Sequence, residues 1–415
     1  MKQGDRKRVA EQEGIGLRAV LQRGLHALAV VAGMQSLQKL LEEDREALCG
    51  PRYEHDAGRA ATRFGHTRGE LVLGGRRVSG KRPRVRSQGR EVQLPSWELA
   101  SREDLLTGRA FEQMVLGVST RGYGRSLEPV PEEIASRGES KSAVSRRFVR
   151  QGEKMLAERL AARLEGVELA ALLVDGLHFG EHVVLCALGI DVTGKKRVLG
   201  LWEGATENAS ACKALFENLV ERGLRTDRTI LVIIDGAKAL ARAVRDHFGS
   251  RALIQRCQVH KRRNVLEALP ERLRASVGAA ISEAYRSGDA ERAKRMLLNL
   301  ARRLQREHPG AAASLREGLD ETLTVARLGL PYRLARSLST TNAIENMLGR
   351  VRVVSRNVKR WRGGTMILRW VAAGTSEAER GFRRLKGHAS MPILVAKLRE
   401  HDAKIDKLDQ PKEAA

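Results

Sequence analysis

Two unbroken aliphatic runs, each followed by an Asp-Gly pair, dominate the hydrophobic pattern of the chain. The first covers residues 170–174 and leads into Asp175, and the second covers residues 230–234 and leads into Asp235. Apolar runs of this length are typical of strands that are buried on both faces. The pattern therefore predicts two central strands, each with a carboxylate at its carboxyl end, where ligands collect in open α/β sheets.

The pattern around these two runs predicts a mixed α/β unit at residues 166–260. The predicted strands cover residues 169–174, 182–192, 197–202, 230–234 and 252–257. The predicted helices cover residues 208–222 and 237–248. Three strands followed by alternating helices and strands is the order of the ribonuclease-H-like fold, in which the first and fourth strands are neighbours. We therefore expect Asp175 to lie beside Asp235.

Helical periodicity replaces the strand pattern after residue 260. Between residues 261 and 335, segments broken at Pro and Gly repeat apolar positions at three and four spacing, which predicts an all-helical insertion. The α/β unit then resumes at residues 336–398, where a new helix begins that carries Glu345. We predict that the tail, residues 399–415, is disordered.

Three regions precede the α/β unit. Residues 1–50 have the spacing of amphipathic helices, which suits core packing or self-association. Residues 51–100 are rich in Gly and Arg and alternate as in a short hairpin, so the basic stretch from Arg76 to Arg86 is either a phosphate-contacting arm or a solvated loop. Residues 101–165 are predicted to be mainly helical and to bind DNA.

A turn at Gly138 separates two predicted helices in the third of these regions. Ser140 suits the N-cap of the second helix, whose Val144 and Phe148 would face inward. This is the layout of a helix-turn-helix with a basic recognition helix, although ordinary helical hairpins share it. The residues that would face outward, and so contact DNA, are Lys141, Ser142, Ser145 and Arg146.

The chain is strongly basic. Lys and Arg outnumber Asp and Glu by 75 to 50, which gives a formal net charge of +25. Such a protein is expected to bind polyanions, with nucleic acid as the first candidate. Aromatic residues make up only 4% of the chain, too few for a protein that mainly stacks single-stranded bases, so duplex DNA fits better.

Cysteine usage and hydropathy indicate a cytoplasmic protein. The four cysteines form no C-x-x-C pair and are too sparse for a disulfide scaffold. The N-terminus lacks the apolar core of a signal peptide, and the most apolar run, residues 25–34, is too short to span a bilayer. No membrane role is expected.

The candidate carboxylates also have structural interpretations. Asp235 can cap the helix that follows it, and Asn342 with Glu345 fits a capping box. A helix that continues from Glu345, however, presents Gly349 and then a track of cations on its carboxylate face. The cations of this track are Arg352, Arg356 and Lys359, and together with Arg350 they are the candidate DNA contacts on this helix. A carboxylate that is followed by cations on the same helix face suits the binding of a DNA backbone along the helix.

Three carboxylates from two strand ends and a helix can hold two Mg²⁺ ions, for which Mn²⁺ can substitute. The candidate ligands are Asp175, Asp235 and Glu345. Ions set about 4 Å apart clamp the attacking and leaving oxygens of an in-line phosphoryl displacement and lower the pKa of a bound water. The sequence thus predicts metal-dependent phosphodiester chemistry in a basic protein.

Five short motifs, taken in order, resemble the signatures of the Mutator-type transposases of bacterial insertion sequences. They are Asp175-Gly-Leu-His-Phe, Thr206-Glu-Asn, Ile234-Asp235-Gly, Cys257-Gln-Val-His260-Lys-Arg-Arg-Asn264 and Thr341-Asn-Ala-Ile-Glu345. The resemblance spans roughly residues 105–398. It implies an Asp-Asp-Glu transposase whose catalytic triad is Asp175, Asp235 and Glu345.

The resemblance also implies substrates and partners. Such an enzyme binds the terminal inverted repeats of its element, nicks the element ends with activated water and joins the resulting 3′-hydroxyl to target DNA. Because two ends must be joined, we expect a homodimer or a higher oligomer, acting on the nucleoid in a bacterial cytoplasm.

Further motif residues have open roles. Cys257 and His260 match a family motif, but they supply only two of the four ligands of a structural zinc site, so packing or support of the triad is the preferred interpretation. His178 can support the triad or be structural. Cys212 stands where many relatives carry a tryptophan, which casts doubt on a base-stacking role there but not on the triad.

Two other functions remain open at this point. A catalytically silent DNA-binding regulator descended from a transposase would use the segment around Ser140 to Phe148, although three intact carboxylates argue against it. A ribonuclease-H-like nuclease without strand transfer would have the same triad. Only the resemblance separates hydrolysis from transesterification.

Overall fold

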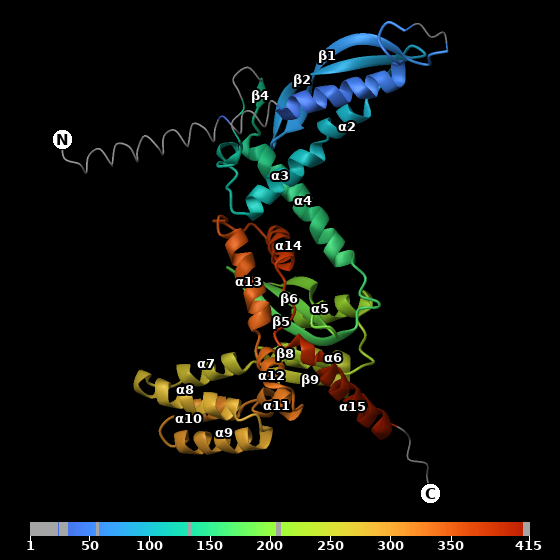
Figure 1. Ribbon diagram of the computed structural model, residues 1–415. Helices are drawn as coiled ribbons and strands as arrows, with labels where there is room; N and C mark the ends of the chain where they lie inside the picture. The colour runs from blue at the N-terminus through green and yellow to red at the C-terminus, as the bar shows by residue number, and fades with distance from the viewer. Residues whose placement is uncertain are drawn as a thin grey trace, which may run out of the picture. The chain divides into compact units, whose positions relative to one another are not determined.

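The structure is a computed structural model, and it describes residues 32–54, 58–128, 135–204 and 209–409 together with Gly24 and Val130. The chain forms two compact units, unit 1 (residues 1–151) and unit 2 (residues 152–415), which are coloured in chain order in Figure 1. The border between them falls inside one helix, α4 (Lys141–Ala161). It therefore precedes the border that we predicted at residues 165 and 166.

A small antiparallel sheet forms the centre of unit 1. Its strands are β1 (Thr62–Leu73), β2 (Arg76–Ser87), β3 (Arg90–Val92) and β4 (Ser136–Arg137), in the order β1-β2-β3 with β4 paired to β2. The turn between β1 and β2 uses Gly74 and Gly75, both with positive φ. The predicted hairpin is confirmed, although it is longer than expected, and the basic stretch lies in β2 rather than in a loop. Its contact with phosphate stays a prediction.

Helices cover this sheet on the side of its apolar residues. Residues 32–49 are helical, and they share a buried cluster with α2 (Pro95–Ser101) and the sheet that includes Leu41, Val78 and Trp97. The predicted N-terminal helix is thus confirmed from residue 32 onward, and it packs on a core. The part of that prediction before residue 32, Gly24 apart, lies outside the described residues.

The predicted helix-turn-helix is only half correct. α4 forms as predicted, because the Ser140 side chain accepts a hydrogen bond from the Ala143 N–H at 3.2 Å, and Val144 and Phe148 are buried. The residues before Gly138 do not form the end of a first helix. They form β4, whose backbone pairs with Arg77 and Val78 of β2. Residues 131–134 lie outside the described part of the chain.

A polar contact holds the start of α4 in place. The Arg147 guanidinium donates to Glu139 Oε2 at 3.1 Å and to the Thr107 hydroxyl at 3.2 Å. Thr107 belongs to α3 (Glu103–Val115), so this contact ties α4 to α3. A short 3-10 turn, η1 (Gly124–Ser126), follows α3.

Unit 2 is built on a five-stranded mixed sheet of order β7-β6-β5-β8-β9. Its strands are β5 (Leu169–Phe179), β6 (His182–Asp191), β7 (Lys196–Gly204), β8 (Ile230–Ile234) and β9 (Ala252–Arg256). β5, β6 and β7 form an antiparallel meander, and β8 and β9 run parallel to β5. The mixed α/β prediction and the adjacency of the first and fourth strands are confirmed.

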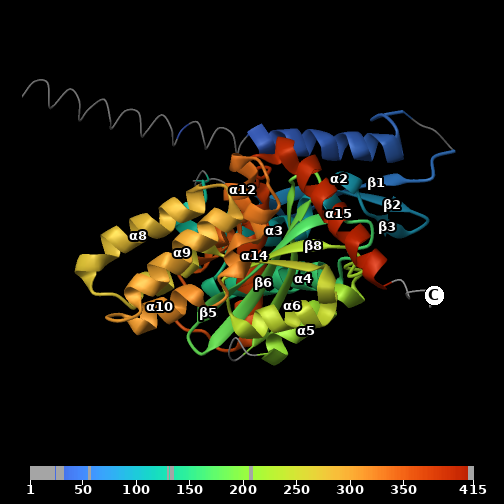
Figure 2. The ribbon, with the colours of Figure 1, turned by 90° about the horizontal axis from the view of Figure 1, so that it is seen from below.

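Each face of this sheet is covered by helices. α5 (Ala209–Glu221) and α6 (Lys238–Phe248) bury one face and lie along the same side of the strands in Figure 2. α13 (Asn342–Ser355) and α14 (Gly364–Arg380) bury the other face, where Leu173, Leu177 and Ile233 of the sheet join Ile344 and Met347 of α13 in one core. Residues two apart on a strand share a face, so this second face also carries the side chains of the acidic site.

A block of helices separates β9 from α13. It contains α7 (Gln258–Glu267), α8 (Glu271–Arg286), α9 (Ala290–Leu304), α10 (Pro309–Arg316), η3 (Asp320–Leu323), α11 (Thr324–Arg327) and α12 (Tyr332–Leu338). The block has its own apolar core, with Val265, Ile281, Leu297 and Leu315 fully buried. The helical periodicity predicted for residues 261–335 is confirmed.

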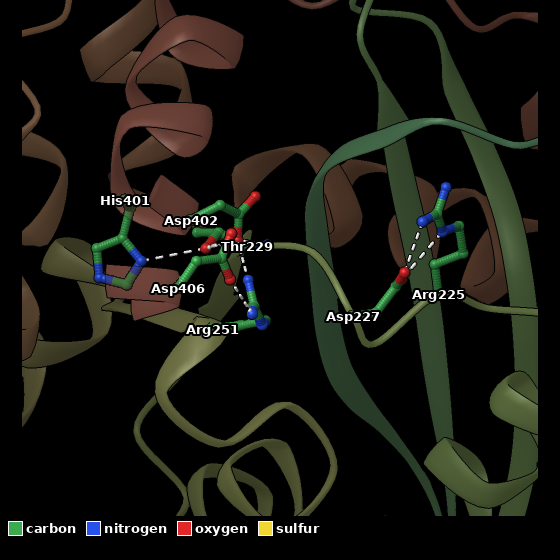
Figure 3. Close-up of polar contacts among 7 residues, drawn as sticks. All are labelled: Arg225, Asp227, Thr229, Arg251, His401, Asp402 and Asp406. Carbon is green, nitrogen blue, oxygen red and sulfur yellow. Dashed lines mark hydrogen bonds and ion pairs between the residues drawn. The ribbon is translucent and has the colours of Figure 1, made fainter. Parts of the chain in front are cut away.

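The last helix, α15 (Met391–Asp409), follows the turn η4 (His388–Ser390) and contradicts the prediction of a disordered tail from residue 399. Figure 3 shows how it is held. Arg251 donates to Asp402 at 2.8 Å and to Asp406 at 2.6 Å, and the Thr229 N–H donates to Asp402 at 2.7 Å. The polar sequence concealed these pairings because each partner lies more than 150 positions away.

Candidate active site

The sheet register brings Asp175 and Asp235 together. β5 pairs in parallel with β8 through Leu173 and Ile233, and the same register, two residues further on, places Asp175 opposite Asp235. Neighbouring strands lie about 4.8 Å apart. Both carboxylates share the face that α13 covers, because each lies two residues after a residue of that core.

One detail of the predicted strands is wrong. We expected both strands to end at their Asp-Gly pair, and β8 does end at Ile234, but β5 continues to Phe179. It continues because β6 remains hydrogen-bonded beside it as far as the pair Phe179 and His182. Asp175 therefore lies within β5. The strand on the other side of β5, β8, ends at the level of Asp175.

The electrostatics of Asp175 indicate that Asp235 and Glu345 both lie close enough to affect it. Burial, then the charge of Asp235 and more weakly that of Glu345, raise the pKa of Asp175 to about 6. A hydrogen bond from the Gly176 N–H, at 2.9 Å, and the charge of His260 act in the opposite direction. A carboxylate whose pKa is raised by neighbouring negative charges lies at a site that attracts a cation.

Asp235 is held by the turn that leads into α6. Its Oδ1 accepts a hydrogen bond from the Ala237 N–H at 2.9 Å, which uses one of the two carboxylate oxygens. Gly236 has φ of 114°, and a Cβ at this position would lie 2.2 Å from Nε of Arg256, so only glycine fits. The N-cap residue of α6 is Ala237 rather than Asp235. The Asp235 hydrogen bond holds the turn that precedes the helix.

Glu345 lies in the first turn of α13, but not in the capping box that the sequence suggested. The N-cap residue is Thr341, and Asn342 is already helical. The Glu345 carboxylate accepts a hydrogen bond from the Thr341 hydroxyl at 2.5 Å. The capping-box interpretation is therefore wrong, because Glu345 binds a side chain rather than the backbone N–H of Asn342.

Cys257 and His260 lie beside Glu345. His260 Nε2 is 3.8 Å from Glu345 Oε1, and one donor atom from each of the three residues lies within 4.8 Å of the others. Burial alone would raise the pKa of the Cys257 thiol, but hydrogen bonds with His260 and Thr341 hold it below its usual value. The hydrogen bond with Cys257 raises the pKa of His260. The sequence analysis named all three residues, but it did not predict that Glu345 lies beside the Cys257 and His260 pair.

His178 does not belong to this cluster. It lies in β5 three residues after Asp175, and the alternation of the strand places it on the opposite face of the sheet, where it is exposed. Cys212 is a residue of α5, and its side chain is fully buried in the core that α5 shares with the sheet. The motif beginning at Thr206 lies outside the described residues.

The cations that follow Glu345 are all exposed, but the predicted track is shorter than expected. α13 ends at Ser355, Arg356 is its C-cap residue, and Lys359 lies beyond the helix. Of the three cations in the helical count from Glu345, Arg352 lies within α13, Arg356 lies at its end and Lys359 lies outside it. Arg350, the remaining candidate, also lies within α13. In unit 1, the candidate contacts on α4 are exposed as predicted. They are Lys141, Ser142, Ser145 and Arg146.

The donor set fits a hard divalent cation. All three carboxylates offer oxygen, the ligand atom that Mg²⁺ and Mn²⁺ prefer. Among the residues that the structure describes, none of the three is ion-paired with Lys or Arg, and His260 Nε2 lies 3.8 Å from Glu345. In a chain with 75 basic residues, these three carboxylates are thus without a Lys or Arg partner in the described ranges.

Fold and site together define a mixed α/β protein with a three-carboxylate site on one face of its central sheet. Residues 27–384 match the sequence model of the Mutator family of transposases. The chain therefore belongs to the Mutator family of transposases. No helix in the described ranges has the length and apolar character needed to cross a membrane.

Several curated relatives are similar over much of their length. The transposase for insertion sequence element ISRM5 of Rhizobium meliloti is 28% identical over 379 residues, which cover 88% of this chain and 90% of the relative. The transposase for IS256 in transposon Tn4001 of Staphylococcus aureus is 28% identical over 76% of this chain and 80% of the relative. The transposase for IS6120 of Mycolicibacterium smegmatis is 29% identical over 59% and 75%, respectively.

Proposed function

We propose that this protein is the transposase of a bacterial insertion sequence, and that Asp175, Asp235 and Glu345 are its catalytic carboxylates. The single observation that carries the proposal is the convergence of these three side chains on one sheet face, in a chain whose family consists of transposases. The strand order β7-β6-β5-β8-β9 supports a ribonuclease-H-like catalytic domain, with helices α7 to α12 as an insertion before Glu345.

The three carboxylates would hold two divalent metal ions, with Mg²⁺ preferred and Mn²⁺ as a substitute. Bound there, such ions polarise the phosphate and activate a water molecule. The role of the protein is to fix the oxygen donors. β5 and β8 fix the two Asp residues in register, and α13 brings Glu345 over the same face.

The proposed reaction consists of two displacements at phosphorus. In the first, water attacks a phosphodiester at the element end, the bond from phosphorus to O3′ breaks, and a free 3′-hydroxyl and a 5′-phosphate result. In the second, that 3′-hydroxyl attacks a target phosphodiester, forms a new bond to phosphorus and releases a target 3′-hydroxyl. The number of phosphodiester bonds is unchanged by the second step, so it needs no external energy source.

Exposed cations would bring the DNA to the site. Arg350, Arg352 and Arg356 extend from the carboxylate end of α13, and the basic face of α4 in unit 1 offers a second contact surface. A homodimer or higher oligomer would hold two element ends together, on the nucleoid in the cytoplasm. Phosphate contacts of this kind make binding sensitive to salt.

Cleavage of a labelled duplex that carries the element's own ends tests this proposal. The parent should nick the duplex with Mg²⁺ or Mn²⁺ and join the new 3′ end to a second duplex. Asp235→Ala and Glu345→Ala should bind the duplex but not cleave it. The matched control is Asp406→Ala, which removes a carboxylate of α15.

Two outcomes would replace the proposal. Salt-sensitive binding without cleavage by the parent would favour the DNA-binding regulator. Cleavage without joining would favour the nuclease. Cleavage that persists in Glu345→Ala would remove that residue from the triad.

A further inference from the structure

The hydroxyl of Thr341 lies at the centre of the Cys257, His260 and Glu345 cluster. Its Oγ1 is 2.5 Å from Glu345 Oε1, 3.2 Å from Cys257 Sγ and 3.3 Å from His260 Nδ1. The Thr341 side chain is fully buried. One hydroxyl therefore contacts all three of the chemically active side chains around it.

A hydroxyl group has a single hydrogen to donate, and the distances indicate where it goes. The contact with the Glu345 carboxylate is the shortest and is assisted by charge, so the hydrogen points to Glu345. The Thr341 oxygen then keeps its lone pairs, and Nδ1 of His260, 3.3 Å away, can donate to it. Cys257 Sγ accepts from the Thr341 backbone N–H instead, so both neighbours help to hold Thr341 in place.

The backbone connects this network to the other end of the acidic site. The Cys257 N–H donates to the Ile234 carbonyl at 2.7 Å, directly before Asp235. Cys257 Sγ accepts a hydrogen bond from the Thr341 N–H at 3.4 Å, and the Thr341 carbonyl accepts one from the Glu345 N–H at 3.0 Å. A continuous series of short contacts therefore runs from the end of β8 to the start of α13.

The same three donors could in principle bind a soft metal ion, because thiolate, imidazole and carboxylate are all zinc ligands. A zinc ion would need to lie about 2.0 to 2.3 Å from each donor atom. The Thr341 hydroxyl is already placed among those donors, at hydrogen-bond distances from each. The geometry favours a hydrogen-bonded support over a metal site.

We propose that Thr341 is a positioning residue, whose hydroxyl fixes the Glu345 carboxylate relative to Asp235 for metal binding. This inference rests on the proposed function. A Glu side chain has three rotatable bonds, and the Thr341 hydrogen bond restricts them by holding one carboxylate oxygen. The second oxygen then remains for the metal. Residues that orient metal ligands in this way are worth about 10- to 100-fold in metal affinity or activity.

The adjacent Thr340 provides a matched control. Its hydroxyl is also buried, but it makes no hydrogen bond to any described residue. Thr341→Val and Thr340→Val remove the same atom from neighbouring positions and keep the shape of the side chain. Thr341→Ser restores the hydroxyl without the methyl group.

The experiment measures Mn²⁺ affinity by electron paramagnetic resonance, together with kcat and KM for cleavage and the melting temperature of each variant. We expect Thr341→Val to lose about 10- to 100-fold in Mn²⁺ affinity and in kcat, with KM for DNA unchanged. Thr341→Ser should recover to within a few-fold of the parent. Thr340→Val should bind Mn²⁺ and cleave like the parent.

The inference is overturned if Thr341→Val and Thr340→Val have equal Mn²⁺ affinities, or if Thr341→Ser behaves like Thr341→Val, which would assign the effect to the methyl group. It is also overturned if the parent binds no Mn²⁺. Failure of the proposed function gives a different pattern, in which the parent and Thr340→Val bind Mn²⁺ but neither cleaves DNA, while the loss of affinity in Thr341→Val still tests the role of Thr341.

Discussion

A cluster of carboxylates lies at each end of β8, and the two clusters differ in whether they are paired with a basic side chain. At the amino end, Asp402 and Asp406 of α15 meet Arg251, and Asp402 also accepts two hydrogen bonds from Thr229, as Figure 3 shows. At the carboxyl end, Asp175 lies near Asp235 and Glu345, and the described residues place no Lys or Arg in an ion pair with any of them.

The difference separates carboxylates that support the fold from carboxylates that are available to a ligand. A paired carboxylate stabilises the folded state through charge-assisted hydrogen bonds. An unpaired cluster does the reverse, because burial and like charge disfavour ionisation, as the raised pKa of Asp175 indicates. A site of the second kind persists in a sequence only if something other than stability maintains it.

The largest effect should come from removing charge at the carboxyl end. We expect Asp235→Asn to reduce metal-dependent cleavage by about 10³-fold or more, as loss of a catalytic group does, and Asp402→Asn to leave the rate within a few-fold of the parent. Initial rates on a labelled duplex, with both variants at equal folded concentration, measure this. Equal losses in the two variants would erase the distinction between the clusters.

The second effect concerns stability. Loss of the Asp175 charge should raise the free energy of unfolding, whereas loss of a side chain normally lowers it. The pKa of Asp175 is about 6 in the folded protein against an ordinary 3.8, so the folded state keeps a proton that the unfolded chain has released. The free energy of unfolding should therefore fall as the pH rises from about 4 to about 6, and the cost, at most about 3 kcal/mol, is fully present above pH 6.

Asp175→Asn removes this cost. In the absence of divalent metal, we expect it to raise the free energy of unfolding at pH 8 by up to about 3 kcal/mol and to change it little at pH 4. Chemical denaturation at both pH values measures the difference. Mg²⁺ should stabilise the parent and not the variant. A variant that is less stable than the parent at pH 8 would contradict the electrostatic account.

At the amino end of β8, the same kind of substitution should destabilise. Asp402→Ala leaves the Thr229 N–H without its acceptor and leaves Arg251 with Asp406 alone, and we expect a loss of about 2 kcal/mol. Denaturation followed by circular dichroism measures it. Asp406→Ala serves as the comparison, because that side chain is 60% exposed and its ion pair should contribute less than 1 kcal/mol.

The smallest effect should appear in DNA binding, which neither carboxylate cluster is expected to control. Arg146→Gln on α4 should weaken duplex binding modestly for all sequences and lower the slope of log affinity against log salt by about one. Fluorescence anisotropy at several salt concentrations measures the slope. Asp235→Asn should leave the slope unchanged, since it removes negative rather than positive charge.

The sequence predicted the parts of the site that depend on local pattern and strand order. The apolar runs before Asp175 and Asp235 and the order of strands were enough to predict that the two residues are neighbours, and pairing between β5 and β8 confirms it. The helix that carries Glu345 was also predicted. These features follow from short-range hydrophobic periodicity.

What the sequence did not reveal depends on contacts between distant segments. The pairing of β4 with β2 and the binding of α15 by Arg251 join residues that are far apart in the chain, so no local pattern indicates them. Thr341 was visible inside a motif, but its contact with Cys257 spans 84 positions. The interpretation of Asn342 as a cap was wrong by one residue, since the helix begins after Thr341.

Because Glu345 follows the helical block in the chain, the ribosome makes the DNA-binding candidates of unit 1 well before it completes the three carboxylates. Glu345 leaves the ribosome roughly 110 residues after Asp235, a delay of about 5 to 20 s at 5 to 20 residues per second. Unit 1 is complete within that interval, whereas the sheet face that bears the two Asp residues is covered only when α13 and α14 follow. If unit 1 binds DNA as proposed, a prematurely terminated chain would bind DNA without being able to cut it, and would compete with the finished protein.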